Sequence, residues 1–202
     1  NLEGINLIDV DFKQTTGFNK ITSKSNQYIS TCFNIAIKLI KNNVSNKFIN
    51  GPISKKTFLK KKFNGITEYL ANKTNVKKFA MIIYNKKLSI CPLTTHLPIK
   101  HVSKRINKIE IITKVKLIDN FWKEKFNKQP RIGITGLNPH CESTDSFNED
   151  KIIILPTVKK LQKLRYNIEG PFAADTIFLK NNRKRFDLII GMYHDQVLTP
   201  IK

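Results

Sequence analysis

Apolar residues recur at helical spacing near the start of the chain. They lie three or four positions apart: Ile29, Phe33, Ile37 and Ile40. A serine at position 23 or 25 can cap the first turn, so the pattern predicts an amphipathic helix over residues 23–43. Residues 47–50 predict a short strand that runs into the turn at Gly51 and Pro52.

The rest of the chain alternates between short β-branched runs and helical stretches. Strands are predicted over residues 78–84 and 87–93, joined as a hairpin by Asn85 and Lys86, and over residues 131–137 and 186–192. Helices are predicted over residues 98–126 and over residues 148–165, the second interrupted near Pro156. This alternation predicts an α/β fold, in which ligands gather at the ends of the strands.

Length and composition are typical of a globular protein. A chain of 202 residues with 40% hydrophobic residues can bury a substantial core. No apolar run approaches the ~18 residues of a membrane span and no signal peptide opens the chain, so we expect no membrane partner. Three widely spaced cysteines do not suggest a disulfide framework and favour a cytoplasmic location. The start at Asn1 and the stop just after Pro200 predict a fragment of a longer protein.

The net charge of +21 would ordinarily suggest nucleic acid as a partner. However, nearly all of the 36 basic residues are lysines, and they are spread evenly along the chain with many Asn, Ile and Phe residues. Such an even spread indicates a bias of the coding genome, whereas nucleic-acid-binding proteins tend to cluster Arg and Lys on one face. We therefore expect no nucleic-acid partner. A basic nucleic-acid-binding protein remains the alternative from another functional class, and a basic enzyme would suit a phosphorylated substrate.

Three of the four histidines share one local context. His96, His140 and His194 each lie where a short β-branched run gives way to a loop. Imidazole is the commonest protein ligand of zinc and similar ions, and three protein ligands with an open position are typical of a catalytic metal site. Their separations are too long for a local finger, so only the tertiary fold can bring them together. Taken singly, each could instead be a hydrogen-bonded loop or core residue.

Several polar residues near these histidines are candidates for supporting roles. Asn138, Glu142 and Asp195 can hold the second ring nitrogen of a metal ligand. Asp175 is either a site residue or a helix N-cap. Cys141 is either a nucleophile or fourth ligand, or a small packed residue.

Five motifs occur in the order and approximate spacing of one enzyme family. They are Gly51-Pro-Ile-Ser-Lys55, Thr94-Thr-His-Leu-Pro98, Gly136-Leu-Asn-Pro-His140, Gly170-Pro-Phe-Ala-Ala-Asp-Thr-Ile-Phe178 and Met192-Tyr-His-Asp-Gln196. Over residues 51–202 the chain thus resembles the 4-hydroxythreonine-4-phosphate dehydrogenases, whereas residues 1–50 match loosely. The resemblance implies a two-lobed α/β/α fold like that of isocitrate and isopropylmalate dehydrogenases, with the active site in the cleft between lobes. Residues 1–64 would belong to the first lobe and residues 65–202 to the second, which would carry the metal site.

The resemblance also implies an activity. It is the oxidation of 4-phosphooxy-threonine by NAD or NADP to a 2-amino-3-oxo acid, which decarboxylates to 3-amino-2-oxopropyl phosphate during pyridoxal phosphate biosynthesis. The fold that the family resembles needs no Gly-x-Gly-x-x-Gly motif for this cofactor. A homodimer with a site shared between subunits is implied as well.

The implied site residues fall into three groups. A divalent metal ion (Zn, Mg or Co) would be held by the three histidines, substrate would contact Thr67 and Lys202, and Asp175 and Asp195 are candidates for orientation or proton relay. Ile66 stands where the family has a substrate-binding histidine. This departure keeps open a dehydrogenase of a phosphorylated sugar acid, such as 4-phospho-erythronate or 4-phospho-threonate. A catalytically inactive homologue is a third possibility.

Overall fold

The computed structural model describes all residues except 1–3, 15–16, 18–19, 61 and 202. The chain divides into two compact units, Asn1–Asn75 and Val76–Lys202. This division falls later than the one after residue 64 that the sequence suggested. The second unit contains a parallel sheet with helices on both faces, so the predicted α/β class is confirmed.

The first unit is built around helix α1 (Asn26–Lys41), which confirms the predicted amphipathic helix. It also contains a short 3-10 turn η1 (Ser23–Ser25), a π-helical turn η2 (Lys55–Leu59) and helix α2 (Ile66–Lys73). The strand predicted over residues 47–50 is wrong, because that segment is irregular. Phe48 packs its ring against Phe33 of α1, with centroids 5.5 Å apart, so the segment's apolar character serves packing.

An aromatic cluster forms the core of this unit. Phe33 stacks on Phe58 at 5.8 Å and meets Tyr69 edge-on at 5.2 Å. Tyr69 also contacts Phe58 and Phe63 edge-on, at 5.2 and 5.6 Å. Aromatic pairs favour such offset and edge-to-face geometries. The cluster therefore holds α1, η2 and α2 together.

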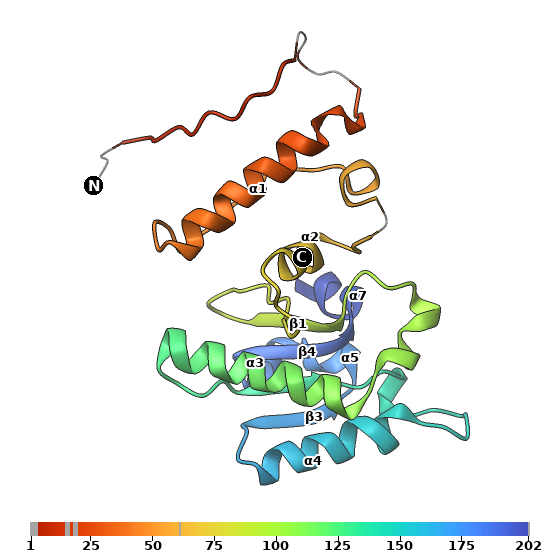
Figure 1. Ribbon diagram of the computed structural model, residues 1–202. Coiled ribbons are helices and arrows are strands. Elements are labelled where there is room, and N and C mark those ends of the chain that lie inside the picture. Colours follow the sequence, from red (N-terminus) through yellow and green to blue (C-terminus); the bar gives the residue numbers. More distant parts are fainter. Residues whose placement is uncertain (1–3, 15–16, 18–19, 61, 202) are drawn as a thin grey trace. The chain divides into compact units, whose positions relative to one another are not determined.

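The second unit contains a four-stranded, all-parallel sheet in the order β1-β4-β2-β3 (Figure 1). Its strands are β1 (Ser89–Thr94), β2 (Ile132–Thr135), β3 (Ile168–Phe172) and β4 (Leu188–Tyr193). The predicted strands at 87–93, 131–137 and 186–192 correspond to β1, β2 and β4. Of the predicted hairpin, an isolated antiparallel bridge between Ile83 and Ile90 forms. The sequence did not indicate β3, because Gly170 and Pro171 interrupt its pattern.

The helices of this unit are α3 (Lys108–Phe126), α4 (Leu155–Lys163), α5 (Ala174–Ile177), α6 (Lys180–Arg183) and α7 (His194–Leu198). Shorter turns are η3 (Ile99–His101), η4 (Ser103–Arg105), η5 (Pro139–Cys141), η6 (Asp150–Ile154) and η7 (Thr199–Ile201). The predicted helix over 98–126 begins at residue 108, because the Asn107 side chain accepts a hydrogen bond from the Glu110 N–H at 3.0 Å and caps α3. Among the described residues, no helix is long and apolar enough to cross a membrane.

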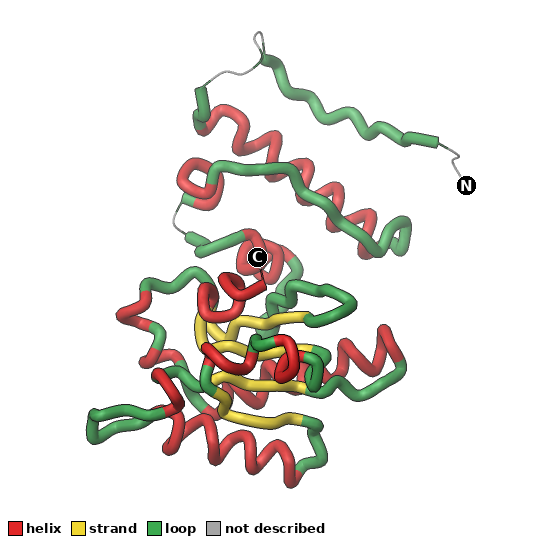
Figure 2. The backbone as a smooth tube through the Cα atoms, turned by 180° about the vertical axis from the view of Figure 1, so that it is seen from behind, coloured by secondary structure: helices red, strands yellow, loops and turns green. Residues whose placement is uncertain are grey.

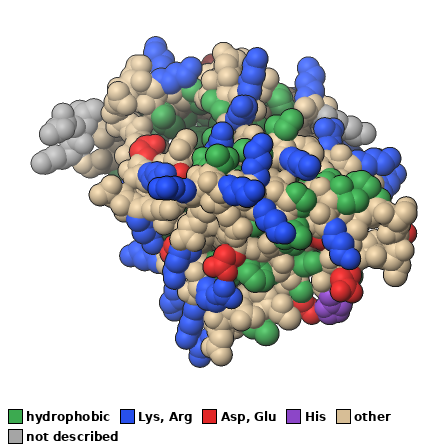
Figure 3. Space-filling model, turned by 90° about the horizontal axis from the view of Figure 1, so that it is seen from below, with side chains coloured by type: hydrophobic (Ala, Val, Ile, Leu, Met, Phe, Trp, Pro, Cys, Tyr) green, Lys and Arg blue, Asp and Glu red, His purple; other side chains and the backbone are tan. Residues whose placement is uncertain are grey.

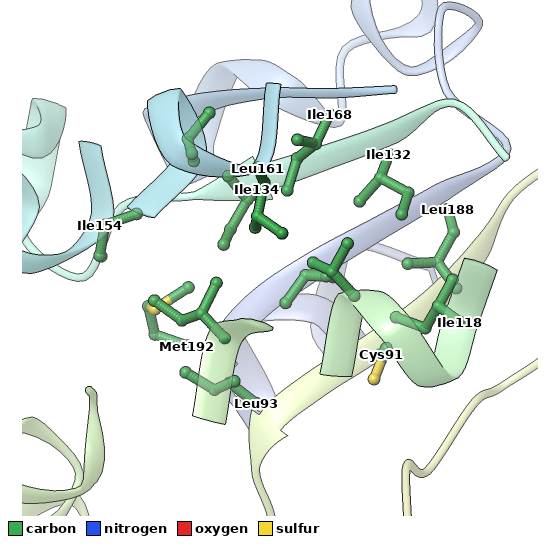
Figure 4. Packing of buried hydrophobic residues seen from close by; sticks show 14 of the residues in the cluster. Cys91, Leu93, Ile118, Ile132, Ile134, Ile154, Leu161, Ile168, Leu188 and Met192 are labelled. Carbon is green, nitrogen blue, oxygen red and sulfur yellow. The ribbon is translucent and has the colours of Figure 1, made fainter. Parts of the chain in front are cut away.

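The two faces of the sheet bury different helices. Helices α3 and α4 cover one face, where Ile118 and Leu161 pack on Ile134 and Leu188 (Figures 1 and 4). The short helices α5 and α7 cover the other face, with α7 contributing Val197 (Figure 2). Chain order explains this, since right-handed crossovers from β1 to β2 to β3 advance in one direction and the return to β4 reverses it.

The neighbouring strands β2 and β4 send the chain to opposite faces of the sheet at their carboxyl ends. The segment after β2 leads to α4, whereas α7 follows β4 directly. In open α/β sheets, such a divergence leaves a crevice in which ligands bind.

The amino ends of β2 and β4 are joined by a charged side chain. Asp187 accepts hydrogen bonds from the Arg131 backbone N–H at 2.9 Å, the Arg131 guanidinium at 3.3 Å and Lys128 Nζ at 3.1 Å. Burial raises the pKa of Asp187, but these hydrogen bonds outweigh it and leave the pKa below its ordinary value of 3.8.

This pKa shift predicts a pH-dependent contribution to stability. Because the pKa of Asp187 is lower in the folded than in the unfolded chain, ionised Asp187 stabilises the fold above pH 3.8, and this stabilisation is lost as pH falls through the lowered pKa. We expect Asp187→Asn to lower the free energy of unfolding by about 1 kcal/mol at pH 7, measured by urea denaturation. The gap should close below pH 3.8. A gap that persists unchanged at pH 3 would contradict this assignment, and the exposed Asp145→Asn serves as control.

Two leucines three positions apart test the assignment of the core. Leu161 is fully buried beneath the sheet, whereas Leu164 at the end of α4 is 55% exposed. We expect Leu161→Ala to lower the free energy of unfolding by about 2–5 kcal/mol, because it leaves a cavity. Leu164→Ala should change it by less than about 0.5 kcal/mol. Similar urea midpoints for the two variants would show that α4 does not pack as described.

Candidate functional site

The three histidines follow three neighbouring strands. His96 lies just after β1, His194 is the first residue of α7 after β4, and His140 lies in η5 after β2. Because β1, β4 and β2 are adjacent and parallel, their carboxyl ends lie along one edge of the sheet. The fold therefore brings three residues that are distant in sequence to that edge.

Two of these histidines lie side by side. The ring centroids of His96 and His194 are 5.5 Å apart, and the ring planes are inclined by 38°. An ion bound ~2.0–2.1 Å from one nitrogen of each ring would place the centroids roughly 5 Å apart. Both side chains are partly buried. Their separation and donor type thus fit two ligands of one metal ion.

His140 is not gathered with this pair. Across the residues that the structure describes, no three His, Cys, Asp or Glu side chains lie close enough together to hold a metal ion. The His140 side chain is exposed on the η5 turn. The structure therefore brings two of the three predicted ligands together. The third, His140, lies in the loop after the neighbouring strand β2.

The backbone at these positions is strained. His96 has a φ of 51° and His140 a φ of 54°, both in the left-handed region. This conformation costs an L-residue roughly 1–2 kcal/mol, and it persists where the surrounding structure fixes it. Such residues cluster at functional sites. The surrounding structure therefore has to fix the backbone of both histidines.

Asp195 holds the ring of His194. Its carboxylate Oδ1 lies 2.7 Å from His194 Nδ1. A neutral imidazole that donates from Nδ1 to this carboxylate keeps its lone pair on Nε2, which is the form that binds a metal ion. Asp195 thus contacts the ring of His194 in the structure, although the Asp195 side chain is 79% exposed.

Asp175 and Cys141 have less specific surroundings. Asp175 is exposed in the first turn of α5, whose N-cap is Ala173, so the N-cap interpretation of Asp175 is wrong. Burial raises the pKa of the Cys141 thiol, as do the charges of Asp150 and Asp175, while a backbone hydrogen bond from Gly136 lowers it. A raised pKa disfavours the thiolate that a nucleophile or a ligand needs.

The loop that carries His140 is fixed by a buried carboxylate that the sequence analysis missed. Asp150, 1% exposed, accepts hydrogen bonds from the Leu137 N–H at 2.8 Å, the Asn138 N–H at 3.1 Å and Asn138 Nδ2 at 3.0 Å. A Cβ on Gly136 would lie 2.5 Å from Asp150 Oδ1, so glycine leaves room for the carboxylate. Local pattern could not reveal this role, because the contact depends on how the loop folds back.

One of the two predicted substrate contacts belongs to the first unit. Thr67 is a partly buried residue in the first turn of α2, in the first unit. Its neighbour Ile66 packs against the aromatic cluster of that unit. Lys202 lies outside the described residues.

Comparison with known proteins identifies the family. The model of the family described as pyridoxal phosphate biosynthetic protein PdxA matches residues 1–202. The chain is 39% identical over 202 residues to the 4-hydroxythreonine-4-phosphate dehydrogenase of Sulfurihydrogenibium sp., an alignment that covers 98% of this chain and 61% of that protein. It is 31% identical over 141 residues to the D-threonate 4-phosphate dehydrogenase of Pectobacterium atrosepticum, covering 69% of this chain and 43% of that protein. It thus spans less than two thirds of the length of these curated relatives.

The fold agrees with that of a solved relative. The crystal structure of 4-hydroxythreonine-4-phosphate dehydrogenase from Klebsiella pneumoniae superposes with a TM-score of 0.79 at 26% identity, over 90% of this chain and 57% of that one. Sequence and structure therefore agree that the chain belongs to the family of pyridoxal phosphate biosynthetic proteins PdxA.

Proposed function

We propose that the protein containing this chain oxidises 4-phosphooxy-threonine with NAD or NADP, in a reaction that depends on a divalent metal ion. The product, a 2-amino-3-oxo acid, loses carbon dioxide because its carbonyl β to the carboxylate accepts the electrons, and 3-amino-2-oxopropyl phosphate results. This is a step toward pyridoxal phosphate. The pair of histidines at the ends of β1 and β4, in a chain that matches PdxA throughout, carries the proposal.

The metal ligands would be His96 and His194, with His140 as the third. When bound, a divalent ion on neutral imidazoles would polarise the secondary alcohol of the substrate and lower its pKa. An all-imidazole donor set suits zinc or cobalt better than magnesium, which prefers oxygen ligands. Asp195 supports this assignment, because its contact with His194 favours the ring form with a free Nε2 lone pair.

The remaining assignments concern substrate and assembly. Lys202 and Thr67 would bind the anionic and polar groups of the substrate, Lys202 through charge-assisted hydrogen bonds. Asp175, exposed near the start of α5, would take part in proton relay, as would Asp195. Hydride would pass from the carbinol carbon to the nicotinamide. A homodimer with a shared site is also part of the proposal and rests on the family resemblance.

One residue, Ile66, supports a second candidate substrate class. Ile66 has no hydrogen-bonding group on its side chain and packs in the aromatic cluster, where the family usually has a substrate-binding histidine. A relative that is 31% identical over 141 residues is named D-threonate 4-phosphate dehydrogenase. The second candidate is therefore the oxidation of a phosphorylated sugar acid at the same metal site.

Nucleic-acid binding receives no comparable support. Figure 3 shows Lys and Arg side chains scattered over the face that it presents, with Asp and Glu side chains among them. Specific nucleic-acid binders instead concentrate basic residues in a patch or stripe.

Product analysis of the full-length protein distinguishes the two substrate classes. We expect NAD(P)H formation with carbon dioxide release from 4-phosphooxy-threonine, at a kcat/KM at least tenfold above that for 4-phospho-threonate or 4-phospho-erythronate. The reverse ratio would establish the sugar-acid alternative. No NAD(P)H from any of the three, in protein loaded with zinc or cobalt, would refute both.

The fourth histidine provides a matched control for the metal site. We expect His194→Ala and His140→Ala in the full-length protein to remove most bound metal and nearly all turnover while the protein stays folded, because each removed side chain is partly or fully exposed and belongs to no core cluster. His101→Ala, at an exposed position in η3, should keep both. Metal content after dialysis, measured by mass spectrometry, checks this alongside circular dichroism. Full metal occupancy in His194→Ala would show that this residue is not a ligand.

A further inference from the structure

The backbone pairing between β2 and β4 ends before the candidate site. Its register runs from Ile132 opposite Leu188 to Ile134 opposite Ile190. Beyond this point the strands lead to opposite faces of the sheet, and the Gly136 N–H pairs with Phe172 O of β3 at 2.8 Å. The peptide groups of β2 and β4 that face each other after Ile134 and Ile190 therefore need other partners.

The side-chain amide of Gln196 provides those partners. Its Oε1 accepts from the Met192 N–H of β4 at 2.7 Å and from Thr135 Oγ1 of β2 at 2.7 Å. Its Nε2 donates to Gly136 O at 2.8 Å. The amide thus lies between the two strand ends as a further peptide group would in a sheet ladder. We call these three hydrogen bonds the Gln196 bridge.

The bridge is connected to a third strand end. Thr94 Oγ1, at the end of β1, donates to Met192 O at 2.7 Å. The backbone of Met192 is therefore held at its N–H by Gln196 and at its carbonyl by Thr94. His96 and His194 each follow one of these fixed positions by two residues.

On the β2 side, the bridge continues into the loop of His140. Gln196 holds Gly136 O, and Asp150 holds the next two N–H groups of that loop. The surroundings leave room for this arrangement, because a Cβ on Gly191 would lie 3.1 Å from Gln196 Oε1 and 2.2 Å from Val197 Cγ1. Glycine at position 191 therefore allows α7 to pack close enough for Gln196 to reach β2.

We propose that Gln196 is a positioning residue that sets the separation between the strand ends that carry His140 and His194. The inference rests on the proposed metal-dependent function. It assigns Gln196 no contact with substrate, cofactor or metal. Its effect acts through the backbone, because a displaced strand end moves the histidine that follows it.

Gln162 is a matched control that distinguishes a positioning role of Gln196 from a general contribution to stability. Gln162 Nε2 donates to Ile168 O at 2.8 Å, the same kind of bond that Gln196 makes to Gly136, but Gln162 lies in α4 and bonds the amino end of β3. Loss of either bond lowers stability. If Gln196 positions the histidines, loss of the Gln196 bridge alone also weakens metal binding.

The test compares Gln196→Leu, Gln196→Glu and Gln162→Leu in the full-length protein freed of metal. Co²⁺ is titrated against each, followed by its visible absorption, with a melting curve for every variant. We expect Gln196→Leu to raise the Kd for Co²⁺ about tenfold or more and to alter the absorption bands, as loss of outer-shell partners does. Gln196→Glu retains the two accepted hydrogen bonds and should lie between Gln196→Leu and wild type. Gln162→Leu should bind Co²⁺ as wild type does.

The results distinguish a failure of the positioning role from a failure of the proposed function. Folded Gln196→Leu with the Kd and spectrum of Gln162→Leu would overturn the positioning role and leave the proposed function intact. If Gln196→Leu does not fold, Gln196→Glu decides, and a wild-type Kd in that variant would overturn the role. A wild-type protein that binds no Co²⁺ would refute the proposed metal site, and the positioning role with it.

Discussion

The pairing of β2 with β4 is the constraint on which the second unit depends. Its backbone register spans three residue pairs, and side-chain hydrogen bonds contribute at both ends. At the amino end, Asp187 joins the start of β4 to Arg131 before β2. At the carboxyl end, the Gln196 bridge replaces the ladder where the strands diverge. The charged contact of Asp187 stabilises the amino ends of the two strands, and the neutral amide of Gln196 spans their carboxyl ends beside the candidate site.

The neutrality of the amide at the open end has a physical rationale. A carboxylate in place of Gln196 would set a negative oxygen against the carbonyl of Gly136, with no N–H to donate to it. An amide supplies both an acceptor and a donor, so it satisfies N–H and C=O groups at once. The loop after β2 differs because it presents N–H groups alone, and there the buried Asp150 carboxylate is an effective acceptor.

The sequence predicted the elements whose pattern is local and missed those fixed by distant contacts. The apolar spacing from Ile29 to Ile40 revealed α1, and the β-branched runs revealed β1, β2 and β4. Strand β3 was not predicted, because Gly170 and Pro171 resemble turn residues. In the folded chain, β3 forms because it pairs with the neighbouring strand β2. The histidines were found because they share a local context at strand ends. Asp150 and Gln196 were not, because their roles arise from hydrogen bonds that only the folded sheet edge creates.

The same distinction between local and distant contacts explains why the structure brings His96 and His194 together but not His140. His96 and His194 follow strands that pair as far as Thr94 and Tyr193, so the backbone ladder fixes the chain nearly up to these two histidines. His140 follows β2, whose pairing with β4 stops at Ile134, and a loop separates it from the last paired residue. Its position depends on the Gln196 bridge and on Asp150, which fix the start of that loop but not the exposed imidazole. In the proposed metal site, a bound cation would supply the attraction that draws this third ring toward the other two, since each imidazole nitrogen would have to approach the ion to ~2.0–2.1 Å.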